Sequence, residues 1–205
     1  FRALQLPTEA VYCDAAWENQ RGYLGGVWAQ GSNKFDTWRI FATADDLKKL
    51  KGLWRYRKWP SGFSYEAHPI NALEAIAPIL SLFVWGPRLS GRRVIIYIDS
   101  TTAEAVLRDG KSKKFHLTCF GCIFWKWAAF YGIHPIFVWI PSEENVADST
   151  TRDELWVELK KQADVREERP PTADFHTLIE RVATVTDDPF DLIPAEDLPS
   201  FLTPP

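Results

Sequence analysis

Short apolar runs, each bounded by polar or glycine-containing turns, predict five β-strands. The clearest is Val94–Ile98, in which four of the five residues are β-branched and which stops at Asp99. An unbroken apolar run of this length is typical of a strand that is buried on both faces. The other four runs comprise residues 11–16, 22–28, 36–42 and 136–140. The first three runs of the chain follow one another closely and indicate an antiparallel meander.

Helical periodicity predicts helices between and after the later strands. The first helix opens near residue 67, with Asn71 as its cap, and Pro78 is expected to bend or break it. Its apolar face is formed by Leu73, Ile76, Ala77 and Leu80. The other helices are predicted at residues 101–107, at 116–131, from 144 or 145 through 148, at 153–162 and at 172–183.

This order of elements predicts an α/β fold with a mixed five-stranded sheet. Three antiparallel strands are followed by two parallel ones, and helices cover both faces of the sheet. We expect a linker at residues 1–10, one domain at 11–162, and a tail or further linker at 163–205. The last segment is rich in Pro, Asp and Glu, a composition that is typical of extended chain.

Composition indicates the class of protein and the cellular compartment in which we expect it. The 205 residues are 46% hydrophobic and 25% charged, as expected of a globular domain. We find no apolar run that is long enough to cross a membrane, and no signal peptide. Three cysteines do not make a disulfide framework, so we expect an intracellular protein of the cytoplasm or nucleus, not a secreted one. The chain has no Met and begins with Phe1, which indicates a piece of a longer polypeptide.

The net charge of −3 requires any nucleic-acid binding to use a local patch. One candidate is the segment Lys48–Pro60, which interleaves cations with two tryptophans and a tyrosine. The cations would follow phosphates while the aromatic faces pack on sugars or bases. The alternative is a solvated amphipathic helix whose tryptophans enter the core. The candidate contacts are Lys48, Lys51, Arg55, Arg57 and Lys58.

Three further patterns have structural interpretations. Cys119 and Cys122 have C-x-x-C spacing but no second cysteine pair, so we expect buried thiols. The aromatic stripe of the same segment is expected to form core. Its members are Phe120, Phe124, Trp127 and Phe130. The histidines at 116 and 134 are expected to be cap or surface residues.

Four acids stand at or near the ends of predicted elements. Asp14 follows the first strand and Asp99 the fourth, while Glu74 and Asp148 belong to helices. If the first and fourth strands are neighbours, Asp14 and Asp99 lie side by side, and the two helical acids could reach the same point. Carboxylates gathered in this way repel one another and raise their pKa values. Magnesium ions remove that repulsion, and two of them form the clamp that is used for in-line phosphoryl displacement.

These acids and their surroundings resemble the ribonuclease H domain of reverse transcriptases from retroelements and pararetroviruses. The resemblance spans residues 11–152, and its last block is similar to the ending of DIRS-like and hepadnavirus-type polymerases. The first matching block is Cys13-Asp14-Ala15, followed by the glycine-rich segment Gly22–Gly26. The second is Ile70–Ala77, which contains Glu74, and the third is Tyr97-Ile98-Asp99-Ser100. The last is Trp139–Arg152, which contains Pro141-Ser142, Asn145 and Ala147-Asp148.

The resemblance implies an enzyme that binds two Mg²⁺ ions, with Mn²⁺ as a possible substitute, and cuts the RNA strand of RNA–DNA hybrids. It implies that Asp14, Glu74, Asp99 and Asp148 are both the catalytic residues and the metal ligands. The expected partners are the hybrid and the polymerase domain of the same polypeptide, without a membrane. Ser100, Asn145 and Arg152 are candidate contacts to nucleic acid near these acids.

The order of the acids separates this family from others with the same fold. Proofreading exonucleases carry a D-x-E motif on the first strand. This chain has Ala16 at the position of the Glu in that motif. Transposases and integrases end with Glu, whereas here Glu74 lies between two aspartates. The chain lacks the His that many cellular ribonucleases H carry before the last Asp, and it has Thr151-Arg152 where the motif has Ser-Arg. Two alternatives stay open: a catalytically silent tethering domain, and another nuclease on the same fold, such as a junction resolvase.

Overall fold

The computed structural model describes residues 8–19, 21–43, 45–46 and 69–184. The strands are β1 (Thr8–Glu18), β2 (Arg21–Gly31), β3 (Lys34–Ala42), β4 (Arg93–Ile98), β5 (His134–Trp139) and β6 (Asp164–Glu167). The helices are α2 (Ile70–Leu89), α3 (Thr101–Asp109), α4 (Phe115–Phe130), α5 (Asp148–Thr151), α6 (Asp153–Gln162) and α7 (Thr172–Thr184), with a 3₁₀ turn at Ser142–Glu144.

The strands form one mixed sheet in the order β5-β4-β1-β2-β3-β6. β1, β2 and β3 are an antiparallel meander, and β4 joins β1, and β5 joins β4, in parallel. This confirms the predicted fold class and the predicted neighbours β1 and β4. The number of strands was wrong, since β6 adds a sixth strand, parallel to β3, within the described residues.

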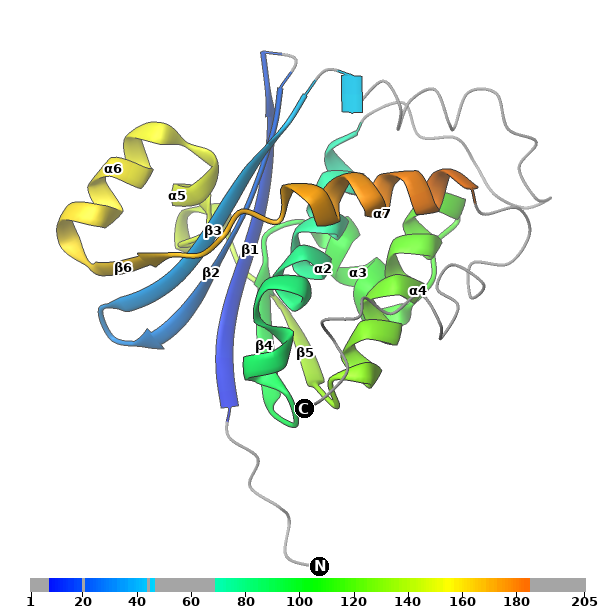
Figure 1. The fold of residues 1–205 in the computed structure, drawn as a ribbon, viewed down its shortest axis with the longest axis horizontal. Helices are drawn as coiled ribbons and strands as arrows, with labels where there is room; N and C mark the ends of the chain where they lie inside the picture. Colours follow the sequence, from blue (N-terminus) through cyan, green and yellow to red (C-terminus); the bar gives the residue numbers. More distant parts are fainter. Residues whose placement is uncertain (1–7, 20, 44, 47–68, 185–205) are drawn as a thin grey trace, which may run out of the picture.

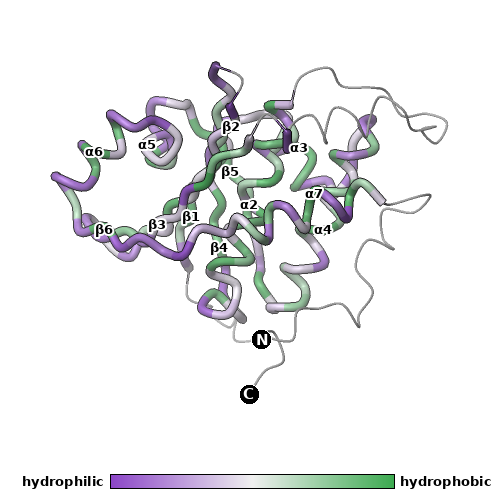
Figure 2. The backbone as a smooth tube through the Cα atoms, turned by 45° about the horizontal axis from the view of Figure 1, so that its top comes forward, coloured by the Kyte–Doolittle hydropathy of each residue, from purple (hydrophilic) through white to green (hydrophobic). Residues whose placement is uncertain are grey.

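Helices cover both faces of the sheet, as Figure 1 shows: α2, α3, α4 and α7 lie on one side, and α5 and α6 on the other. The main core lies between the sheet and the first group, where Trp38 and Trp85 are among the largest fully buried side chains. Figure 2 shows long apolar stretches in α2 and α4, as expected of elements that fill a core.

Helix α2 differs from its prediction at its N-terminus, and it is not broken at Pro78. It begins at Ile70 with Pro69 as N-cap, so Asn71 lies in the first turn and is not the cap. Pro78 does not end the helix, which runs on to Leu89. Proline removes one backbone donor and crowds the preceding turn. Burial of almost the whole helix circumference, from Ala72 to Leu82, offsets that cost.

Of the described helices, α2 alone is long and apolar enough to cross a membrane by length and composition. Because no apolar run of that length was expected from the sequence, this finding corrects the expectation. In the domain 72% of its most apolar window is buried against other elements. A core helix meets the same criteria, and α2 is packed as one.

Helix α4 confirms the buried thiols and most of the aromatic stripe. Cys119 and Cys122 are buried without a disulfide, and Phe120, Phe124 and Trp127 are core residues. Phe130 was wrongly placed in the core, since 39% of its surface is exposed at the last turn of the helix. His116 is 1% exposed and so is not a surface residue, because the first turn of α4 is already covered.

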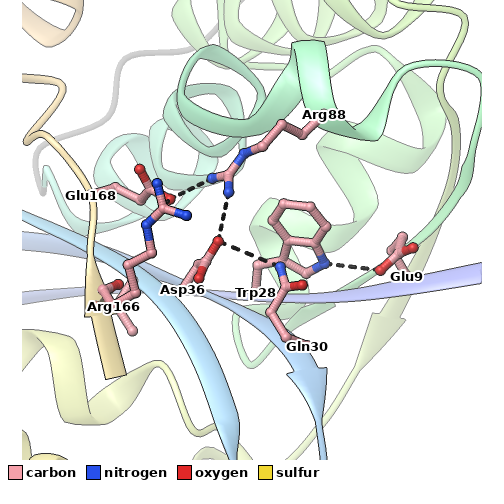
Figure 3. Close-up of polar contacts among 8 residues, drawn as sticks. Glu9, Trp28, Gln30, Asp36, Arg88, Arg166 and Glu168 are labelled. Atoms are coloured by element: carbon pink, nitrogen blue, oxygen red, sulfur yellow. Dashed lines mark hydrogen bonds and ion pairs between the residues drawn. The ribbon is translucent and has the colours of Figure 1, made fainter. Parts of the chain in front are cut away.

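Residues 164–184 extend the sheet and the core. The side chain of Arg88, at the end of α2, contacts Asp36 of β3 at 2.7 Å and Glu168 at 2.5 Å, and lies over the Trp28 ring (Figure 3). Helix α7 confirms the helix predicted at 172–183 and buries Phe175 completely. The division into a domain at 11–162 and a tail at 163–205 stays a prediction, although β6 and α7 pack on the domain.

Candidate metal centre

Three of the four predicted acids meet at one end of the β1–β4 pair. Tyr12 and Tyr97 are partners in the parallel register, and each stands two residues before an acid, Asp14 or Asp99. Glu74 comes from the first turns of α2, which packs on β1. One carboxylate oxygen from each of the three acids lies within 4.8 Å of the others. The sheet topology therefore brings together residues that are up to 85 positions apart in the sequence.

Burial makes this cluster costly without a counter-charge. Asp14 and Glu74 are 4% and 7% exposed. Glu74 Oε2 and Asp99 Oδ1 are buried and have no hydrogen-bond partner in the described part of the chain. A buried carboxylate oxygen without a partner costs several kcal/mol unless it is protonated or bound to a cation.

The pKa values follow from this environment. The pKa of Asp14 is raised to about 7, mainly by burial and also by the charges of Asp99 and Asp148. The hydroxyl of Thr151 and the charge of Arg152 act in the opposite direction. Burial also raises the pKa of Glu74 well above its ordinary value, with contributions from Asp14 and Asp99.

Asp148, the fourth predicted acid, lies beside this cluster but is not one of its three members. It is the first residue of α5, and its charge reaches Asp14. Its Oδ1 atom accepts a hydrogen bond of 2.7 Å from Nε of Arg152. The predicted contact residue Arg152 is thus engaged with a predicted metal ligand.

Two side chains fix α5 against the first strand. The Asn145 amide donates to the backbone carbonyl of Cys13 at 3.1 Å, and its Oδ1 accepts from the backbone N–H of Ala147 at 3.2 Å. The hydroxyl of Thr151 lies 2.5 Å from Asp14 Oδ2 and donates to it. Asn145 is 4% exposed, so it acts here as a positioning residue.

The role of Thr151 was missed by the sequence analysis. The signal was present, because Thr151 occupies the Ser position of the Ser-Arg ending and keeps the hydroxyl of that residue. Only the packing of α5 on β1 shows that this hydroxyl meets Asp14.

Gly25 allows α5 to lie this close. It is paired with Asp14 across the β1–β2 ladder, and a Cβ atom at this position would lie 1.7 Å from Thr150 Oγ1. Gly26 has the same property on the other face, where Ser81 Oγ would lie 2.7 Å from a Cβ atom. Neighbouring elements therefore approach the backbone of the glycine-rich strand closely at both positions.

Asp99 is flanked by a helix cap and by an indole hydrogen bond. Ser100 caps α3, since its hydroxyl accepts a hydrogen bond from the backbone N–H of Ala103. The indole N–H of Trp139 donates to the backbone carbonyl of Asp99 at 2.9 Å, while 49% of the Trp139 surface stays exposed. A fixed, half-exposed aromatic face therefore stands next to the acids.

The predicted basic contacts lie outside the described residues. Lys48, Lys51, Arg55, Arg57 and Lys58 all belong to the segment 47–68. They stay predictions.

We expect the stability of the metal-free protein to fall as the pH rises from about 5 to 8. The folded pKa of Asp14, about 7, lies above the unfolded value of 3.8, so the folded state binds more protons in this window. Over this range, ionisation of Asp14 alone would lower the free energy of unfolding by about 3 kcal/mol. Urea unfolding at several pH values, in EDTA, measures this slope, which Asp14→Asn should reduce. A stability that is constant or rises over this range in EDTA would contradict the expectation.

Comparison with known proteins finds similarity among solved structures only. No protein-family model matches the chain, and no curated protein does. RNase H1 from Halobacterium salinarum NRC-1 is similar at a TM-score of 0.49 and 14% identity, over 74% of this chain and 99% of that one. The N-terminal RNase H domain of Rv2228c from Mycobacterium tuberculosis was solved as a fusion with maltose binding protein. It is similar at a TM-score of 0.48 and 13% identity, over 76% of this chain and 99% of that one.

The topology itself identifies the fold as RNase H-like. β2 runs antiparallel to its neighbours, and β4 and β5 extend the meander in parallel beside β1. The acids lie just beyond the end of the β1–β4 pairing, with α2 on one face and α5 on the other, and Asp14 lies within β1 instead of following it as expected. β6 is the edge strand beside β3, and α7 lies on the same face as α2 and α4.

Proposed function

We propose that this protein is an Mg²⁺-dependent endoribonuclease that cleaves the RNA strand of RNA–DNA hybrids. The observation that carries the proposal is the buried cluster of Asp14, Glu74 and Asp99, with ligand oxygens within 4.8 Å of one another. Its order along the chain is that of the ribonuclease H domains which the sequence resembles.

The residues fit a divalent cation. Two buried carboxylate oxygens, Glu74 Oε2 and Asp99 Oδ1, have no partner in the described structure, and hard oxygen ligands of this kind suit Mg²⁺ or Mn²⁺. With Asp148 as a further ligand, the set could hold two ions. Bound Mg²⁺ would supply an activated water and charge stabilisation for the leaving oxygen.

The chain's own residues would orient the site and receive the substrate. Thr151 holds Oδ2 of Asp14, and Asn145 holds the loop before α5, so Asp14 and Asp148 keep a fixed relation. The half-exposed Trp139 face offers a place for a sugar or base to pack beside Asp99. Ser100, Arg152 and the basic residues at 48–58 would contact the phosphate backbone.

We infer that this activity serves reverse transcription. The support is the sequence resemblance over residues 11–152 to reverse transcriptases of retroelements and pararetroviruses. The polymerase domain of the same polypeptide would then be the partner, and the protein would work inside the cell, in the cytoplasm or nucleus.

A panel of substrates tests the specificity. Hybrids differ from DNA duplexes in the 2′-hydroxyls of one strand and in minor-groove shape. We expect Mg²⁺-dependent cuts in the RNA strand of a labelled RNA–DNA hybrid, and none in duplex or branched DNA of the same sequence. Preferential cleavage of the branched DNA would support a resolvase instead. Binding of hybrid without cleavage of any substrate would support the silent tethering domain.

A further inference from the structure

Asp148, the fourth acid, is paired with Arg152 and is not a member of the carboxylate cluster. Nε of Arg152 lies 2.7 Å from Asp148 Oδ1, within the range of a charge-assisted hydrogen bond. The cluster of oxygens within 4.8 Å contains Asp14, Glu74 and Asp99 but not Asp148. One cation position is therefore assembled from Asp14, Glu74 and Asp99, while Asp148 is paired with Arg152.

The Arg152 charge is directed at the acids. Besides Asp148, its guanidinium interacts electrostatically with Asp14 and Glu18, and it lowers the pKa of Asp14. Arg108 and Glu104 of α3 form an ion pair of the same i,i+4 spacing and the same 2.7 Å length. The charged neighbours of Arg108 are Glu104 and Asp109, and none of the acids of the centre is among them.

The backbone around Asp148 is held in place by its neighbours, so it cannot easily move Asp148 away from Arg152. Asn145 ties the preceding loop to the Cys13 carbonyl, Thr151 binds Asp14, and Thr150 is packed against Gly25. The Arg152 side chain is 54% exposed, so it can move without disturbing the core. Release of Asp148 is thus a side-chain movement of Arg152.

We propose that Arg152 acts as an internal counter-cation, which competes with a second divalent ion for Asp148 in the absence of nucleic acid. This inference rests on the proposed metal centre and adds the order of loading. The first ion enters the Asp14–Glu74–Asp99 cluster, and the second must displace Arg152 from Asp148. Arg152 is a positioning residue in this role, because it acts through Asp148.

Counting bound Mn²⁺ tests the competition without measuring cleavage. Free Mn²⁺ would be quantified by electron paramagnetic resonance during titration of the whole chain, without nucleic acid. We expect the wild type to bind one ion tightly and a second weakly. Removal of one positive charge beside the second position, by Arg152→Ala, should tighten the second ion about tenfold. Arg108→Ala, the matched control, should leave both affinities unchanged.

A double variant shows whether the effect passes through Asp148. If Arg152 acts as proposed, Asp148→Asn combined with Arg152→Ala loses the gain in affinity for the second ion. Equal affinities in the wild type and Arg152→Ala, or a gain that survives Asp148→Asn, would overturn the competition while the metal centre stands. Failure of the wild type to bind any Mn²⁺ would overturn the proposed function itself. Thermal melts confirm that each variant is folded.

Discussion

Asp14→Asn is expected to abolish cleavage and to make the metal-free protein more stable at pH 8. Asp14 is buried, its pKa is raised to about 7, and it shares the cluster with Glu74 and Asp99. Asn has almost the same shape, and its carbonyl oxygen can still accept the Thr151 hydroxyl. Loss of one charged ligand should lower the cleavage rate by about 10³-fold or more, the scale on which charge-stabilising groups act in catalysis.

The gain in stability separates this effect from unfolding. Removing a buried charge that repels its neighbours should raise the melting temperature in EDTA by roughly 5–10 °C for a domain of this size. Asp99→Asn should behave alike in cleavage, since Asp99 Oδ1 is one of the two unpartnered oxygens. Asp109→Asn, at the exposed end of α3, is the control and should change neither quantity. Undiminished Mg²⁺-dependent cleavage by Asp14→Asn would contradict the assignment of Asp14 as a catalytic metal ligand.

Gly25→Ala is expected to damage the centre from outside the set of ligands. The new Cβ would lie 1.7 Å from Thr150 Oγ1 and 2.4 Å from Thr150 Cβ, and Thr150 is fully buried. A short buried side chain cannot swing away, so α5 must shift, and it carries Asp148 and Thr151. Overpacking of this kind costs about 1–3 kcal/mol of stability.

A second glycine provides the control for overpacking. A Cβ at Gly86 would lie 2.2 Å from the Tyr131 ring, a comparable clash. Gly86 stands about 18 Å along α2 from Glu74, at 1.5 Å of helix rise per residue. We expect both variants to lose stability in urea, but only Gly25→Ala to weaken Mn²⁺ binding and cleavage. Normal Mn²⁺ affinity in a folded Gly25→Ala would show that α5 does not position the centre.

The sequence predicted the elements whose signal is local and strong. The β-branched run Val94–Ile98 and the meander are strands, and Asp14 within β1 meets Asp99 after β4 because these strands are neighbours. The order of the acids, rather than any single one, indicated the site. The continuation of α2 through Pro78 was not predictable, because burial of the helix overrides a local penalty.

Features that depend on partners far away in the sequence could not be predicted from the hydrophobic pattern of the chain. β6 has the sequence Asp164-Val165-Arg166-Glu167, with a single apolar residue, and it is a strand because β3 offers a free edge. Its flanks are held by contacts such as the Asn33 amide on the carbonyl of Gln162. The positioning roles of Asn145 and Thr151 likewise need the fold, since their partners lie more than 130 residues away.

Cleavage of a labelled RNA–DNA hybrid by the whole chain, with Mg²⁺ against EDTA, tests the central claim most directly. The account predicts cuts within the RNA strand that leave 5′-phosphate and 3′-hydroxyl ends. EDTA and Asp14→Asn should each stop these cuts while the protein stays folded. Cleavage that persists in EDTA, or in folded Asp14→Asn with Mg²⁺, would contradict the claim that these acids form the metal centre of a ribonuclease H.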